Sequence, residues 1–108
     1  MAVRSRTDGS DVTDVAAIPQ RRLQDLVSVG PAFLRDFELL GVCKVEQLAR
    51  RNPEKLYEGL CRIRGQAQDI CCLDVFSAAV AQARNPQLPL GQCQWWYWSR
   101  RRKVRDAR

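Results

Sequence analysis

The sequence predicts an all-α protein of five short helices that ends in an aromatic and basic C-terminal tail. Apolar residues recur at the three- and four-residue spacing of amphipathic helices, and no strand-like alternation appears outside the Trp cluster at 95–98. Proline and glycine interrupt this spacing often enough to keep each helix short. We therefore divide the chain into a disordered leader (1–17), a helical domain (18–85) and a linker, Trp cluster and basic tail (86–108).

The first two helices are predicted from their prolines and glycines. The leader mixes Ser, Thr, Gly and Asp without an apolar period, which is typical of disorder. A first helix is expected to begin near Pro19, because proline suits the first turn, and to run through Val27 until Ser28-Val29-Gly30 interrupts it. Pro31 then begins a second helix, and Gly41 stands where a C-terminal cap belongs.

Three further helices follow. A short one is expected around Val45–Ala49. Asn52, which precedes a proline, is a good N-cap for the fourth helix, and this helix is expected to end at Gly65. Asp69 can cap the fifth helix, which Asn85-Pro86 ends.

Composition excludes several classes of protein. A chain of 108 residues has room for one domain, and it contains no apolar run of about 18 residues that would span a membrane. Its first residues lack the apolar run of a signal peptide, so we expect a cytoplasmic protein. Five cysteines, an odd number placed in helical segments, argue against a secreted disulfide scaffold.

The net charge of +6 is concentrated at the C-terminus. Residues 1–22 carry a net charge of +1, residues 23–94 carry eight basic and eight acidic groups, and residues 95–108 carry +5. A basic tail of this kind adds salt-sensitive, non-specific affinity for nucleic acids. The candidate phosphate contacts in the tail are Arg100, Arg101, Arg102 and Lys103.

The first hairpin (residues 28–32) is a candidate binding site. A tight turn followed directly by a helix start leaves backbone N–H groups without intrahelical partners, and the helix dipole adds a partial positive charge, so the turn favours phosphate. Besides Ser28 in the turn itself, the expected donors are the amides of Val29, Gly30 and Ala32. Arg35, one turn further on, adds a cation. Such contacts read no bases, so binding would be independent of sequence.

A second hairpin (residues 63–67) repeats this outline 35 residues later. Gly65 ends a helix there and Arg64 stands beside it, which indicates an internal duplication of helix, turn and helix. Its turn matches the anion-site pattern less well than the first. A structural alternative applies to both hairpins, because glycine between two helices is also the simplest way to build a corner.

The cysteines and the Trp cluster each allow two interpretations. Cys61, Cys71 and Cys72 could form a redox pair across the second hairpin, but buried thiols that pack between helices are the favoured interpretation. The chain has no histidine and no paired C-x-x-C motif, so no metal site is expected. The aromatic residues 95–98 could stack on unpaired bases, although folding back onto the helical domain is favoured.

Two resemblances add to these predictions. The run Leu23-x-x-Leu26-Val27-Ser28-Val29-Gly30-Pro31-Ala32 resembles the helix-hairpin-helix signature, with Ser28 in place of its first glycine. A wider set of motifs comprises Val29-Gly30-Pro31-Ala32, Leu39-Leu40-Gly41-Val42, Val45-Glu46-x-Leu48, Pro53-Glu54-x-Leu56-Tyr57, Leu60-Cys61, Gly65-Gln66 with Asp69 and Cys71, Leu73-Asp74-Val75-Phe76 and Trp95-Trp96. This set resembles the small bacterial Cdd1 or "pathogenicity locus" family, some members of which are labelled mitomycin resistance proteins. The resemblance implies a tandem helix-hairpin-helix fold and a link to DNA, which would fit binding to damaged DNA.

These observations favour a non-catalytic module that binds the backbone of a nucleic acid, expected to be DNA, independently of sequence. A protein-interaction module, which the neutral helical domain fits, and a thiol-based redox sensor are the alternatives. An enzyme is not expected, because the chain has no histidine, no Ser-based triad and no clustered carboxylates. We expect no cofactor and no membrane partner, and the sequence does not specify an oligomeric state.

Overall fold

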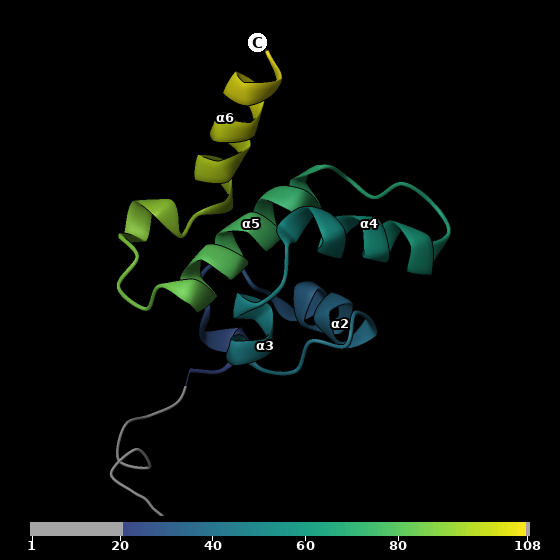
Figure 1. The fold of residues 1–108 in the computed structure, drawn as a ribbon, viewed down its shortest axis with the longest axis horizontal. Helices are drawn as coiled ribbons and strands as arrows, with labels where there is room; N and C mark the ends of the chain where they lie inside the picture. The colour runs from purple at the N-terminus through teal and green to yellow at the C-terminus, as the bar shows by residue number, and fades with distance from the viewer. Residues whose placement is uncertain (1–20, 108) are drawn as a thin grey trace, which may run out of the picture.

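The computed structural model describes residues 21–107, which contain five α-helices, two 3-10 turns and no strand (Figure 1). In chain order the elements are η1 (Leu23–Asp25), α2 (Pro31–Leu39), α3 (Val45–Ala49), α4 (Pro53–Arg64), α5 (Cys71–Arg84), η2 (Leu90–Gln92) and α6 (Trp95–Asp106). The all-α prediction is confirmed. The expected leader (1–17) lies outside the described residues. No helix in the described part of the chain is long and apolar enough to cross a bilayer.

The central element is α5, which packs against α3, α4 and α6 (Figure 1). It carries alanines and valines on the faces where these helices meet, and small side chains let neighbouring helices approach closely. Phe76 is fully buried, and its ring lies 6.0 Å from that of Phe33 and 5.5 Å from that of Phe37, measured between centroids. These aromatic contacts join α2 to α5 and form the centre of the core.

Several predicted helix ends are confirmed. The side chain of Asn52 accepts a hydrogen bond from the Glu54 amide at 2.8 Å and caps α4. Gly65 ends the same helix at a φ of 72°, a left-handed conformation that glycine adopts without steric cost. The carboxylate of Asp69 accepts a hydrogen bond from the Cys71 amide at 2.9 Å, at the start of α5.

The expected first helix, from Pro19 through Val27, is wrong within the described residues. Only the short 3-10 turn η1 forms there, and Leu23 and Leu26 point into the core. The backbone N–H and C=O of Val27 bond to the side chain of Gln82 on α5, at 2.9 Å each, instead of to a helical turn. Tertiary contacts thus replace the local helix that the apolar spacing predicted.

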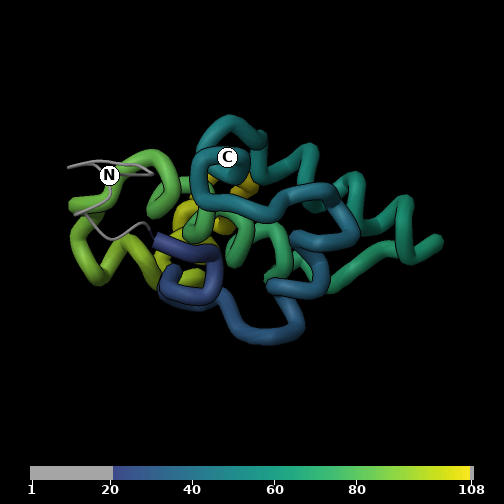
Figure 2. Tube along the Cα trace, turned by 90° about the horizontal axis from the view of Figure 1, so that it is seen from below, coloured from purple at the N-terminus to yellow at the C-terminus, as the bar shows by residue number. Residues whose placement is uncertain are grey.

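The C-terminal segment contains a regular helix, α6, which the sequence interpretation treated as a tail. It runs antiparallel to α5, since Cys93 just before α6 contacts Gln82 near the end of α5, whereas Arg102 pairs with Asp74 near its start. Figure 2 shows the beginning of this helix close to the purple N-terminal turn. The C-terminal helix is therefore part of the folded domain.

Candidate nucleic-acid interface

The first hairpin has the geometry of a tight turn that leads directly into a helix. Ser28 has a φ of 73°, and among the described residues it is the only one other than glycine with a positive φ. Serine therefore occupies the left-handed conformation for which glycine is the usual residue. After Val29, Gly30 is the N-cap of α2 and provides no capping side chain. Ser28 therefore forms the left-handed residue of this turn.

The amides of this hairpin differ in their availability. The Val29 N–H donates to the Leu26 carbonyl at 3.3 Å, and only 8% of Val29 is exposed, so this residue is not the free donor that the sequence predicted. Within the described chain, the amides of Gly30, Ala32 and Phe33 have no acceptor. Phe33 was missed, although any helix that begins at a proline leaves its third amide unpaired. Three donors therefore lie together at the start of α2.

A second helix begins beside the same turn. The backbone N–H of Trp95, the first residue of α6, lies 3.3 Å from the hydroxyl oxygen of Ser28, which accepts its hydrogen bond. Neither α2 nor α6 has an acidic residue in its first turn, and the N-cap residue of each, Gly30 or Gln94, provides no capping side chain. The positive ends of two helix dipoles consequently lie next to each other, an arrangement that a bound anion would stabilise.

Gln82 holds the hairpin in place. This buried residue of α5 exchanges two hydrogen bonds with Val27, and its side-chain nitrogen lies 3.4 Å from the carbonyl of Cys93. One side chain thus fixes both the approach to the first hairpin and the segment that leads into α6. No sequence signal marked Gln82, because its role depends on residues far away in the chain.

The second hairpin differs from this arrangement. Residues 66–70 separate Gly65 from α5 and run back along α4, where the Tyr57 hydroxyl donates to the Gln68 carbonyl at 2.5 Å. The carboxylate of Asp69 occupies the start of α5, and its hydrogen bonds with Cys71 lower the pKa of Asp69. A negative charge already stands where a phosphate would bind. The amides of Gly65 and Gln66 donate to the carbonyls of Arg62 and Cys61, so the turn at Gly65 does not offer these two donors to a ligand.

Two of the predicted cations are held by internal ion pairs. Arg64 pairs with Asp36 of α2, whose side chain is 10% exposed. Arg102 donates two hydrogen bonds to the carboxylate of Asp74, at 2.9 and 3.0 Å, and these bonds raise the pKa of Arg102 further. Both arginines are structural in this arrangement. Arg100, Arg101 and Lys103 remain exposed on α6.

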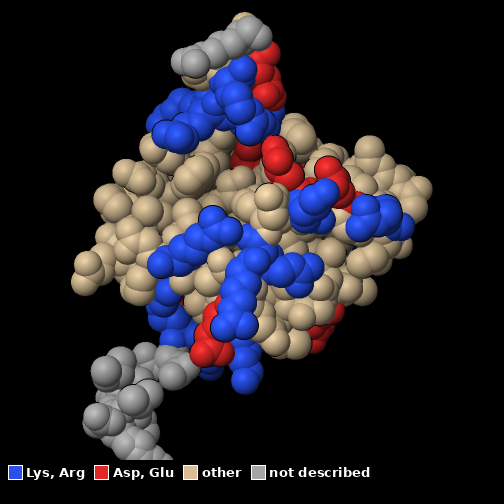
Figure 3. All heavy atoms as spheres, in the orientation of Figure 1, with Lys and Arg blue, Asp and Glu red and all other residues tan. Residues whose placement is uncertain are grey.

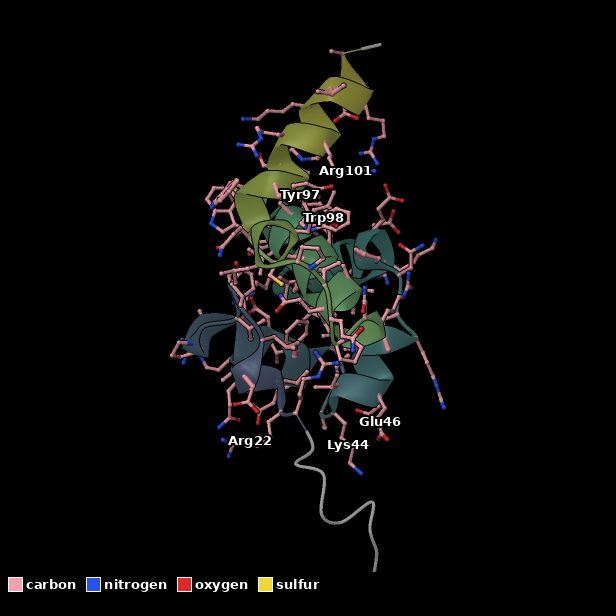
Figure 4. All side chains as sticks on the ribbon, turned by 90° about the vertical axis from the view of Figure 1, so that its left-hand side faces the viewer. Arg22, Lys44, Glu46, Tyr97, Trp98 and Arg101 are labelled. Carbon is pink, nitrogen blue, oxygen red and sulfur yellow. The ribbon has the colours of Figure 1, made fainter. Side chains whose placement is uncertain are left out.

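Basic residues gather in two regions of the surface (Figure 3). One is α6, and the other includes a groove of about 800 Å³ that Arg35 lines together with Arg21, Arg22 and Lys44. Glu38 and Glu46 line the same groove and reduce its net charge. Arg22 and Lys44 lie at the opposite end of the molecule from α6 (Figure 4). Arg35 is therefore near other cations, but in a groove of mixed charge.

Two cysteines near the second hairpin, Cys71 and Cys72, lie in an environment that disfavours the thiolate. Cys61, Cys71 and Cys72 are all free and partly buried. A hydrogen bond with Asp69 raises the pKa of Cys71, and burial raises the pKa of Cys72. Thiols with a raised pKa are weak nucleophiles at neutral pH. Residues 21–107 contain no cluster of side chains suited to a metal ion.

These features define a small all-α protein with a tight turn that leads into a helix start with free amides, and with an arginine-rich C-terminal helix. The chain belongs to the Cdd1 family, described as "Pathogenicity locus", whose model matches residues 18–104 and so includes most of α6. It is also 37% identical, over 98 residues, to the mitomycin resistance protein McrB of Streptomyces lavendulae. That match covers 90% of this chain and 78% of the relative. No solved structure is significantly similar to the chain.

Proposed function

We propose that this chain is a non-catalytic module that binds the sugar-phosphate backbone of DNA at the first hairpin, independently of base sequence. The observation that carries the proposal is the start of α2, where the amides of Gly30, Ala32 and Phe33 have no acceptor within the described chain. Backbone amides at a helix start bind phosphate oxygens and make no contact with base edges.

The charge distribution around the turn supports this proposal. The start of α6 brings a second positive helix end next to the hairpin through the Trp95–Ser28 hydrogen bond. Arg100, Arg101 and Lys103 are exposed further along α6 and would add affinity that weakens as salt is added. A role in tolerance of DNA damage would fit the resistance that the name of the Streptomyces relative records.

The test uses two variants with the same charge change. Ala32 and Ala67 are both exposed, the first at the start of α2 and the second beside Gly65. Ala32→Glu places a carboxylate among the free amides, where it stabilises the helix but repels phosphate. Ala67→Glu makes the same change at the second hairpin and serves as the control.

Binding of the full chain to a fluorescent duplex would be measured by anisotropy at about 50 and 200 mM salt. We expect Ala32→Glu to weaken binding about tenfold or more, because charge-assisted hydrogen bonds to phosphate are lost, and Ala67→Glu to leave it unchanged. Equal losses in the two variants would show that only the overall charge matters. Affinity that does not fall with salt would contradict backbone binding.

A protein-interaction module is the second candidate. Leu39, Ile63 and Ile70 are each at least two-fifths exposed, and they come from the ends of α2 and α4 and the segment before α5. A contiguous apolar patch would favour a partner surface, and these three side chains are the residues to test for one. Recovery of one protein partner after nuclease treatment, lost in an Ile63→Ser variant, would support this function over DNA binding. The raised thiol pKa values weigh against a redox sensor.

A further inference from the structure

The helix α6 carries an aromatic–arginine repeat that the fold uses only in part. Three consecutive aromatic residues, 96–98, are each followed four residues later by an arginine, 100–102. Residues four apart lie on one face of a helix, so each ring can contact the arginine one turn above it. The guanidinium of Arg100 lies 4.7 Å from the ring centroid of Trp96, and that of Arg101 lies 5.7 Å from the Tyr97 ring.

The third pair of this repeat has a structural role. The indole N–H of Trp98 donates to the Gln92 carbonyl at 2.8 Å, and Arg102 is bound to the buried Asp74. Trp98 and Arg102 therefore attach α6 to the rest of the domain. Figure 4 shows Tyr97, Trp98 and Arg101 along one side of the helix, next to the domain below it. The hydrogen bond of Trp98 to Gln92 and the ion pair of Arg102 with Asp74 explain why the fold needs the third pair.

The first pair has no comparable role. Trp96 is 42% exposed, the neighbouring Trp95 is 38% exposed, and Arg100 is exposed as well. The exposed indole ring of Trp96 presents an apolar, π-electron-rich face on which a planar group can stack. Arg100 already holds the Trp96 ring in one orientation, which lowers the entropy cost of stacking a further planar group on it. Trp96 and Arg100 together form a preorganised stacking surface, which we call the platform.

We propose that Trp96, supported by Arg100, stacks on an unpaired nucleobase of a single-stranded segment. This inference rests on the proposed function and deepens it, since the Trp95–Ser28 hydrogen bond places the platform beside the phosphate-binding turn. A base within a duplex has both faces covered by its neighbours, so only an unpaired base can stack on an indole. The positive charges of Arg100 and Lys103 suit the phosphates that flank such a base.

The experiment compares strands that carry the same phosphates with and without bases. One ligand is a ten-nucleotide oligothymidine, and its partner is an abasic strand of equal length and charge. We expect the full chain to bind the oligothymidine at least about fivefold more tightly, since each stacked base contributes strongly to affinity. Tryptophan fluorescence should be quenched by the oligothymidine and not by the abasic strand.

Two variants locate the platform. Trp96→Ala should reduce oligothymidine affinity to that of the abasic strand while leaving duplex affinity unchanged. Val104→Ala, which alters another exposed apolar residue of α6, should change neither. The same comparison is made with a ribo-oligomer and its abasic counterpart. Tighter binding than the abasic strand with either sugar supports the platform. The sugar that gives the larger increase in affinity shows whether DNA or RNA supplies the base.

The outcomes separate this inference from the proposed function. Equal binding of the normal and abasic strands by the unmodified chain, or a gain that survives in Trp96→Ala, overturns the stacking platform. Duplex binding that remains sensitive to Ala32→Glu would then still support the phosphate site. Failure of the chain to bind any of these nucleic acids overturns both.

Discussion

The two hairpins of this chain both contain one left-handed residue, but they differ at the start of the helix that follows. Each contains one residue with a left-handed backbone, Ser28 in the first and Gly65 in the second. In the first, only Val29 and Gly30 separate Ser28 from the start of α2, and the leading amides of this helix stay free. In the second, residues 66–70 intervene and Asp69 caps α5 with a carboxylate.

This difference shows that a left-handed residue makes a turn but does not make an anion site. An anion site also needs a helix that starts at once and has no acidic cap. Two ion pairs also join helices of the domain: Asp74–Arg102 links the start of α5 to α6, and Asp36–Arg64 links α2 to the end of α4. These differences can be tested separately.

The largest effect is expected from removing the two anchoring carboxylates. Asp74→Ala should lower the free energy of unfolding by about 3 kcal/mol, because it leaves Arg102, only 14% exposed, without its partner. Asp36→Ala should lower it by about 1 kcal/mol, because Arg64 is 40% exposed and can turn toward water. Urea unfolding followed by circular dichroism measures both values.

A double variant provides the control for this pair. Replacing Asp74 and Arg102 together, as Asp74→Leu with Arg102→Met, should recover much of the lost stability, because no unpaired charge remains in the interface. A double variant as unstable as Asp74→Ala would mean that the loss came from packing. Equal losses in the free energy of unfolding for Asp74→Ala and Asp36→Ala would mean that the burial of the arginine does not decide how much each ion pair contributes.

Replacing the glycine of each hairpin by alanine should affect different properties: Gly65→Ala should lower stability, and Gly30→Ala should weaken duplex binding. Gly65→Ala should destabilise the fold by about 1 kcal/mol, because alanine at a φ of 72° is strained. Gly30 has a φ of −97° and no atom within 4 Å of an added Cβ, so Gly30→Ala should leave stability unchanged. The added methyl would instead obstruct a phosphate at that amide and weaken duplex binding severalfold.

Denaturation and duplex anisotropy on the same two preparations check this crossed result. Gly65→Ala should bind duplex as the unmodified chain does, once folded protein is counted. A binding loss in Gly65→Ala equal to that in Gly30→Ala would assign both hairpins to the interface.

The helix ends were predictable because they depend on local rules. Asn52, Gly65 and Asp69 act at the positions that their side chains and backbone preferences favour, whatever surrounds them. The free amides of the first hairpin were predictable in part, since a helix that starts at Pro31 leaves its first amides unpaired, although Val29 was wrongly included and Phe33 left out. These predictions depend only on residues that are neighbours in the sequence.

Most of the misses depend on distant partners, whereas those at Val29 and Phe33 were local, since Val29 bonds to Leu26 three residues earlier and Phe33 is the third residue of α2. The helix α6 has no capping side chain and depends on Asp74 and Gln92 for its contacts, so the aromatic and basic run gave no local helix signal. Val27 has its backbone groups bonded to Gln82, 55 residues away. Arg64 and Arg102 each pair with an acid 28 residues earlier in the chain, and charge counting cannot distinguish such arginines from free ones.

A smaller effect is expected in the thiol chemistry of the second hairpin. The pKa of Cys71 is raised, chiefly by its hydrogen bond with Asp69, so its alkylation rate should rise with pH at a midpoint above that of free cysteine. Below that midpoint the thiol is protonated and the rate should be severalfold lower. Asp69→Asn should move the midpoint back down. Mass spectrometry after timed iodoacetamide treatment, with peptide mapping, gives the rate at this residue.

The midpoint of the pH profile is the decisive quantity, because restricted access of the reagent slows alkylation at every pH without moving the midpoint. A midpoint below that of free cysteine would indicate an activated thiol and would favour the redox alternative.

The smallest effect concerns Ser28, where the two hairpins are most alike. Ser28→Ala keeps the strained backbone and loses the hydrogen bond from Trp95, which is long at 3.3 Å, so we expect a loss of roughly 0.5 kcal/mol. Ser28→Gly loses the same bond but relieves the left-handed strain, so its stability should stay within about 0.5 kcal/mol of the unmodified chain. Urea unfolding of both variants measures the difference. A glycine variant less stable than the alanine variant would contradict the argument from left-handed strain, because both variants lack the hydroxyl and differ only in backbone preference.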